Sequence, residues 1–182
     1  MDFEVFRIVA LAAPGSVEAA LGKVQEELFS RHGLASAQAL PPLITVAFLS
    51  AEAPTRGLLG SLNDAVRAPW SIRTAGCEWA EEYLYVRVES GGVWAALRAQ
   101  TLEICGPETG RLFPVREGFF MGCGDAAPAQ RDAIHPVVPA AAFSSGDLML
   151  VSIEGPSDRR AWWRELYWEI LEQRPLRGRR ET

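Results

Sequence analysis

The seven-residue run LITVAFL at positions 43–49 constrains the fold more than any other part of the chain. Every residue in it is apolar except Thr45, and two prolines at positions 41 and 42 mark where it begins. A short apolar run that is rich in β-branched residues and bounded by turn residues is typical of a strand buried on both faces. Because both faces of such a strand must be covered, we expect other elements to pack on each side of it.

Strand and helix patterns alternate along the rest of the chain. We expect further strands over residues 3–12, 70–78, 83–89, 117–123 and 143–153, and helices over 16–33, 54–67 and 91–105. Residues 161–171 fit either element, because Trp162, Leu166 and Ile170 suit a helix face and, together with Trp168, one face of a strand. Each half of the chain starts with a strand and a helix and holds a buried strand at a comparable place. This order predicts an α+β protein built from two related lobes.

Composition excludes several classes of protein. The chain has 182 residues, of which 48% are hydrophobic, and a net charge of −5, so it has enough apolar surface for a globular core and too few cations for broad binding to duplex DNA. No apolar run approaches the roughly 20 residues that span a bilayer, and the start MDFE lacks the basic residues of a secretion signal. The three cysteines lack metal-ligand spacing. We therefore expect a cytoplasmic protein with no membrane contact, metal or cofactor.

Common catalytic motifs are missing from the sequence. It has no phosphate-binding GxxxxGK[ST] loop, no HExxH and no GxSxG. Its two histidines, His32 and His135, fall at the end of an expected helix and in an expected loop. The six tryptophans suit core packing, and the alternative is base stacking in a groove for single-stranded RNA. Motifs alone therefore assign no reaction.

The segment PLITVAFL resembles the first motif strand of the two-histidine phosphoesterases, which include RNA 2′,5′-ligase and RNA 2′,3′-cyclic phosphodiesterase proteins. That strand typically reads Pro-His-Ile-Thr-Leu-x-Phe-Leu. The opening FRIVALAAP, the segments APWSIRTAGCEW and EYLYVRV, and the closing AFSSGDLMLVSIEGP are similar to the family as well. The resemblance implies a bilobal, pseudo-symmetric α+β fold in which two antiparallel sheets face a central cleft, with helices outside. It makes residues 161–171 the last strand, residues 1–173 one domain and residues 174–182 an Arg-rich tail.

The resemblance also implies a mechanism, in which each lobe contributes one His-x-Thr motif to the cleft. One histidine acts as the general base and the other as the general acid on a phosphodiester, while the threonines hold phosphate oxygens. Here Leu43 occupies the first histidine position and Thr45 keeps the threonine. In the segment REGFFMG at 116–122, the second pair is Glu117 with Phe119 or, one residue earlier, Arg116 with Gly118. His135 is a rival, but it lies only eight residues before Phe143.

Three hypotheses about function follow from these replacements. In the first, the protein is a non-catalytic relative that binds a nucleotide or an RNA-end phosphate in its cleft, with Thr45 and Arg116 as the phosphate contacts. In the second, it is an active cyclic phosphodiesterase or RNA ligase-like enzyme, and a desolvated Glu117 replaces the base.

The third hypothesis is a cleft filled by large apolar side chains. Leu43, Phe119 and Phe120 would then exclude water, and the domain would be a scaffold or an oligomer module such as a homodimer. The three hypotheses differ in where these side chains and Glu117 point, which is a question for the structure.

Overall fold

The computed structural model describes residues 3–66, 70–108, 110–156 and 162–176. The strands are β1 (Phe3–Ala12), β2 (Leu43–Leu49), β3 (Ile72–Ala80), β4 (Tyr83–Glu89), β5 (Gly118–Phe120), β6 (Ala142–Phe143), β7 (Asp147–Pro156) and β8 (Tyr167–Pro175). The helices are α1 (Gly15–His32), α2 (Leu58–Ala65), α3 (Val93–Cys105) and the short α4 (Pro128–Arg131), with 3-10 turns η1 (Ala35–Gln38) and η2 (Trp162–Glu165).

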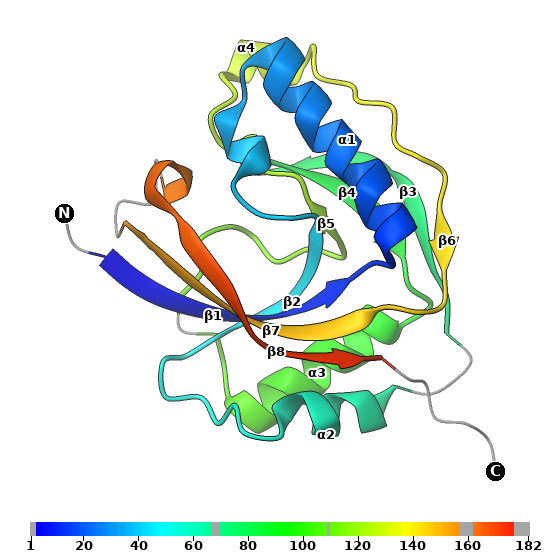
Figure 1. The fold of residues 1–182 in the computed structure, drawn as a ribbon, viewed down its shortest axis with the longest axis vertical. Helices are drawn as coiled ribbons and strands as arrows, with labels where there is room; N and C mark the ends of the chain where they lie inside the picture. Colours follow the sequence, from blue (N-terminus) through cyan, green and yellow to red (C-terminus); the bar gives the residue numbers. More distant parts are fainter. Residues whose placement is uncertain (1–2, 67–69, 109, 157–161, 177–182) are drawn as a thin grey trace.

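The strands form one antiparallel sheet in the order β6-β3-β4-β5-β2-β1-β7-β8. This order divides into two halves of four strands, which meet where Ile44 of β2 pairs with Phe119 of β5. The predicted α+β class with antiparallel strands is therefore confirmed, and the two expected sheets are joined by this short pairing. The sheet curls strongly; α2 lies against β7 and β8 and α3 against β2, whereas α1 lies toward β3 and β4 (Figure 1).

Alternation along the strands separates two hydrophobic clusters, one on each face of the sheet. Ile44 and Phe119 belong to the larger cluster, which also contains the buried side chains of α1, α2 and α3. We call this side the helix face. Leu43 and Phe120, one position away in the same strands, belong to the second cluster. We call that side the inner face, and the first motif position of the family resemblance lies on it.

One expected strand is two strands in the structure. Residues 143–153 were expected to run continuously, but β6 pairs with β3 in one half of the sheet and β7 pairs with β1 in the other. The chain must cross between the halves after Phe143. Gly146 makes this crossing close to β1, because a Cβ at this position would lie 2.5 Å from the backbone oxygen of Ala12.

The last expected strand, 161–171, is only partly a strand. Trp162 begins the turn η2, and its ring is fully buried on the inner face. The indole Nε1 donates a hydrogen bond to Oη of Tyr83 at 3.0 Å. Burial of this ring takes precedence over strand pairing, so β8 starts only at Tyr167 and continues to Pro175. It thus includes the first two residues of the segment expected to be a tail. Among the described residues, no helix is both long and apolar enough to cross a membrane.

Candidate functional site

The first motif position lies on β2, on the inner face of the sheet. Leu43 pairs with Ala12 of β1, and Thr45 pairs with Ala10. Both side chains are buried, at 4% and 2% exposure. Thr45 Oγ1 has no hydrogen-bond partner in the described structure. A buried hydroxyl without a hydrogen-bond partner lowers the stability of the folded state by about 1–3 kcal/mol. Thr45 is therefore an unfavourable residue for stability at this position.

The second motif position lies on β5, next to β4. Phe120 pairs with Tyr85 and Gly118 pairs with Arg87, so Gly118 and Phe120 share the inner face. Phe119 points to the helix face. A Cβ built at Gly118 would approach the backbone oxygen of Val86 to 2.8 Å, closer than real Cβ atoms come. Position 118 is the threonine position in one of the two registers, and no larger residue fits there without a shift of the backbone.

Glu117 is engaged in a local structural contact. Its Oε1 accepts a hydrogen bond from the backbone N–H of Ser90 at 3.1 Å and another from the Ser90 hydroxyl. Ser90 in turn accepts a hydrogen bond from the backbone N–H of Trp94 in the first turn of α3. The carboxylate therefore supports the start of α3. Its role as a replacement base stays a prediction.

Arg116 makes no hydrogen bond to the buried Thr45 of β2 in the described structure. Its side chain is exposed. Burial raises the pKa of Tyr85, and the positive charge of Arg116 partly opposes that rise. The predicted pairing of Thr45 with Arg116 around a phosphate likewise stays a prediction.

Aromatic rings fill the inner face over β4 and β5. Phe113 stacks on Phe120 with ring centroids 4.0 Å apart. The ring centroids of Tyr83 and Trp162 lie within 6.5 Å of those two rings and of each other. All four side chains are at most 2% exposed. We call Tyr83, Phe113, Phe120 and Trp162 the aromatic plug. The four rings are therefore closely packed against one another and exclude water from the plug itself.

The loop before β5 closes the plug. Tyr85 Oη donates a hydrogen bond to the backbone oxygen of Pro114, and Tyr83 Oη donates to that of Leu112 at 3.4 Å. Glu108 anchors the loop by accepting hydrogen bonds from Arg98 and from the backbone N–H of Phe48. Burial alone would raise the pKa of Glu108, but these hydrogen bonds hold it below its usual value. Burial raises the pKa of Tyr83 to about 12, so its phenol is neutral at physiological pH.

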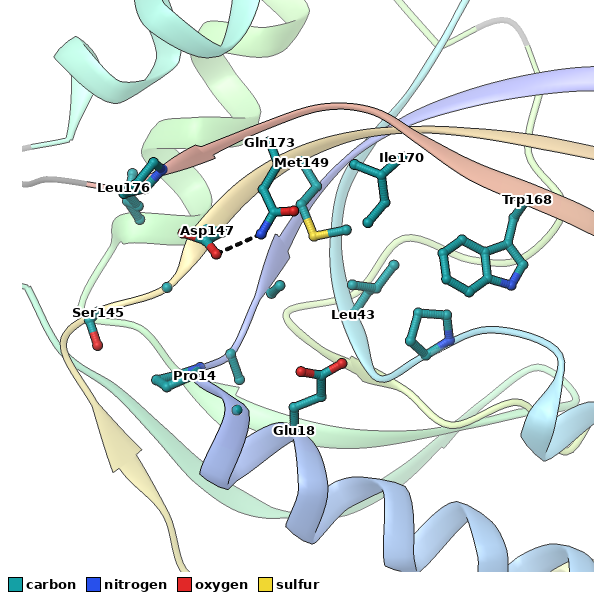
Figure 2. Close-up of a pocket in the computed structure, with 16 residues that line it drawn as sticks. Pro14, Glu18, Leu43, Ser145, Asp147, Met149, Trp168, Ile170, Gln173 and Leu176 are labelled. Carbon is teal, nitrogen blue, oxygen red and sulfur yellow. Dashed lines mark hydrogen bonds between the residues drawn. The ribbon is translucent and has the colours of Figure 1, made fainter.

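The other half of the inner face is open. A cavity of about 660 Å³ lies between the start of α1, the adjoining ends of β1 and β2, and strands β7 and β8. Figure 2 shows Leu43, Met149, Ile170 and Trp168 around it. We call this cavity the Leu43 pocket. The first motif position thus forms part of an apolar wall.

Polar groups enter the Leu43 pocket from two sides. The Glu18 carboxylate points from α1 toward Leu43, and Asp147 and Gln173 lie across the pocket (Figure 2). Asp147 Oδ2 accepts a hydrogen bond from Gln173 Nε2 at 2.8 Å. Within the described residues, the lining contains no arginine, lysine or histidine.

Sequence reasoning missed most of this pocket. Glu18, Asp147 and Gln173 carry no motif, and they are far apart in the chain. Trp168 was singled out only as part of the ambiguous segment 161–171 and as one of six tryptophans. Both histidines lie outside the pocket: His32 ends α1, and His135 is exposed in a loop. No group of three or more His, Cys, Asp or Glu side chains in the described structure is arranged to hold a metal ion.

No protein-family model matches the chain, and no curated protein matches it. Solved structures do. TT0787 of Thermus thermophilus is 23% identical, with a TM-score of 0.58 over 96% of this chain and 100% of that one. E. coli LigT complexed with NADP+ is 16% identical, with a TM-score of 0.54 over 93% and 96% of the two chains. LigT complexed with 3′-AMP is 13% identical, with a TM-score of 0.52 over 94% and 98%. The fold is therefore shared along nearly the whole chain.

Proposed function

We propose that the chain is a diverged member of the two-histidine phosphoesterase superfamily that binds a nucleotide or an RNA end in the Leu43 pocket without cleaving it. The fold shared with LigT and the motif-like strand at 43–49 support the family assignment. LigT itself has been solved with NADP+ and with 3′-AMP, which makes nucleotides the first ligands to test.

The replacement of the first motif histidine by Leu43 carries the non-catalytic part of the proposal. Leu43 is buried on the inner face and holds no proton to transfer. On β5, Gly118 has no side chain, and the Glu117 carboxylate accepts its hydrogen bonds from Ser90. General acid–base cleavage of a phosphodiester needs two titratable groups at the reacting centre. Neither motif strand offers one there.

The Leu43 pocket carries the binding part of the proposal. Its volume of about 660 Å³ lies within the usual range of small-molecule sites, roughly 300–1,000 Å³. Apolar walls with a few polar groups are also typical of such sites. Trp168 adds a flat ring on which a base can stack.

Hydrolysis of 2′,3′-cyclic AMP tests the non-catalytic part. We expect no turnover above buffer for the wild type or for Glu117→Ala, with Glu103→Ala, an exposed position on α3, as the matched control. Turnover that disappears only in Glu117→Ala would contradict the proposal and establish the enzyme hypothesis with Glu117 as the base.

The aromatic plug favours a second candidate, a scaffold or homodimer module. One half of the inner face is already filled, and the outer edge strand β8 exposes Tyr167, Ile170 and Leu171. Two copies pairing through β8 would cover this edge. Light scattering that gives a dimer mass in the wild type and a monomer mass in Leu171→Arg would favour this candidate.

A further inference from the structure

The charge of the Leu43 pocket is unusual for a site that binds phosphate. Glu18 and Asp147 both line it, and no ion pair in the described chain involves either carboxylate. Phosphate sites in proteins use arginine, lysine or free backbone N–H groups. The described lining has no cationic side chain.

The electropositive N-terminus of α1 does not cancel the negative charge of the pocket. A helix N-terminus is electropositive and attracts anions. However, Glu18 lies in the first turn of α1 and already places a negative charge at this end of the helix. A phosphate group in the pocket would therefore lie beside two like charges.

The hydrogen-bonding capacity of the pocket also favours a hydroxyl group over a phosphate. An ionised carboxylate only accepts hydrogen bonds, and so do the oxygens of an ionised phosphate. Hydroxyl groups, in contrast, donate to carboxylates, and an acidic residue that accepts from ribose hydroxyls is a recurrent feature of nucleotide sites. The amide of Gln173, which is oriented by its hydrogen bond to Asp147, keeps its carbonyl oxygen as a further acceptor.

The apolar part of the pocket suits a flat, uncharged ring. Trp168 lies at one end, and Leu43, Met149 and Ile170 lie beside it (Figure 2). Aromatic stacking contributes about 1–3 kcal/mol per base and tolerates any base. The pocket thus combines a surface for a base with acceptors for a sugar.

We infer that the Leu43 pocket takes an unphosphorylated nucleoside with free ribose hydroxyls and discriminates against a terminal phosphate. The base stacks on Trp168, and the ribose hydroxyls donate to Glu18 and Asp147. The inference rests on the proposed function and names the part of the nucleotide that enters the pocket. A free nucleoside and an RNA end that carries a 3′-hydroxyl share this chemistry.

Calorimetric titration with adenosine, 3′-AMP and the dinucleotide ApA tests the inference. For the wild type we expect adenosine to bind at least tenfold more tightly than 3′-AMP. ApA that binds more tightly than adenosine identifies an RNA end as the source, and ApA that binds more weakly identifies a free nucleoside; both results support the shared chemistry.

Variants that remove one negative charge test whether electrostatic repulsion, and not the shape of the pocket, causes the preference for adenosine over 3′-AMP. In Glu18→Gln and in Asp147→Asn, the preference for adenosine over 3′-AMP should shrink to about threefold or less, because one negative charge is gone. Glu26→Gln, an exposed position farther along α1, is the matched control and should keep the wild-type preference.

Two results would overturn the inference, and they differ in what they say about the proposed function. If 3′-AMP binds as tightly as adenosine or more tightly, the charge selection is wrong while nucleotide binding stands. If none of the three ligands binds at millimolar concentration, the nucleotide-binding function fails together with the inference.

Discussion

The two halves of the inner face belong to one sheet, yet they present opposite surfaces. Over β4 and β5, the side chains of the aromatic plug are buried and covered by the loop around Phe113. Over β1, β2, β7 and β8, the Leu43 pocket is open and lined by carboxylates and apolar side chains. Each half contains four antiparallel strands. The plug adds Phe113 from a loop and Trp162 from η2 to Tyr83 and Phe120, which lie on strands. Packing dominates one half, and the Leu43 pocket lies in the other.

Removal of the central ring of the plug is the strongest test of this division. Trp162→Ala should lower the free energy of unfolding by about 3–5 kcal/mol, because it leaves a large cavity among buried aromatic rings. Trp168→Ala in the Leu43 pocket should lower it by less than about 1 kcal/mol, because that ring is already partly exposed. Urea denaturation measures both. Equal losses would show that the two halves do not differ in stability.

High pH should destabilise the protein through the buried phenol of the plug. The pKa of Tyr83 is about 12 in the folded protein against 10.0 as the ordinary value, so the folded state holds its proton more tightly than the unfolded state. This contribution to stability is present below pH 10 and is lost as the pH rises from 10 to 12. We expect the unfolding midpoint to fall over that interval, and the fall should be smaller in Tyr83→Phe.

Thr45→Val is the subtlest test, because Thr45 lies at the boundary between the halves. The substitution removes a buried hydroxyl that has no partner in the described structure and keeps nearly the same shape. We expect a gain of about 1 kcal/mol in the free energy of unfolding. Thr101→Val is the matched control, because its buried hydroxyl donates a hydrogen bond to the backbone oxygen of Leu97 and its loss should not stabilise. A loss of stability in Thr45→Val would mean that the hydroxyl is satisfied in solution.

The sequence predicted strands and helices correctly wherever the hydrophobic pattern fitted only one type of element. Residues 3–12, 43–49 and 83–89 are strands in the structure as predicted. Residues 161–171 were not fully readable, because their spacing suited two elements and burial of Trp162 decided between them. The failure was thus one of tertiary packing, which local periodicity does not report.

The sequence predicted residues of the candidate site only where they lie in a motif. The resemblance drew attention to Leu43 and Thr45, and both lie on the inner face. It gave no indication of Glu18, Asp147 or Gln173. These side chains meet because β1 pairs with β7 in a register that joins Ala12 to Asp147, while α1 begins just after β1. Such a register follows from the whole sheet and has no local sequence signal.

The pairing of β1 with β7 also sets the order in which the protein can assemble during synthesis. Its register joins Phe3 to Pro156, so the first strand leaves the ribosome long before its partner exists. Until then β1 can pair only with β2, and one edge of that strand pair stays open. Folding that waits for such distant contacts is slow and exposes strands to aggregation. The half of the molecule that contains the Leu43 pocket is therefore completed last, after most of the chain has been made.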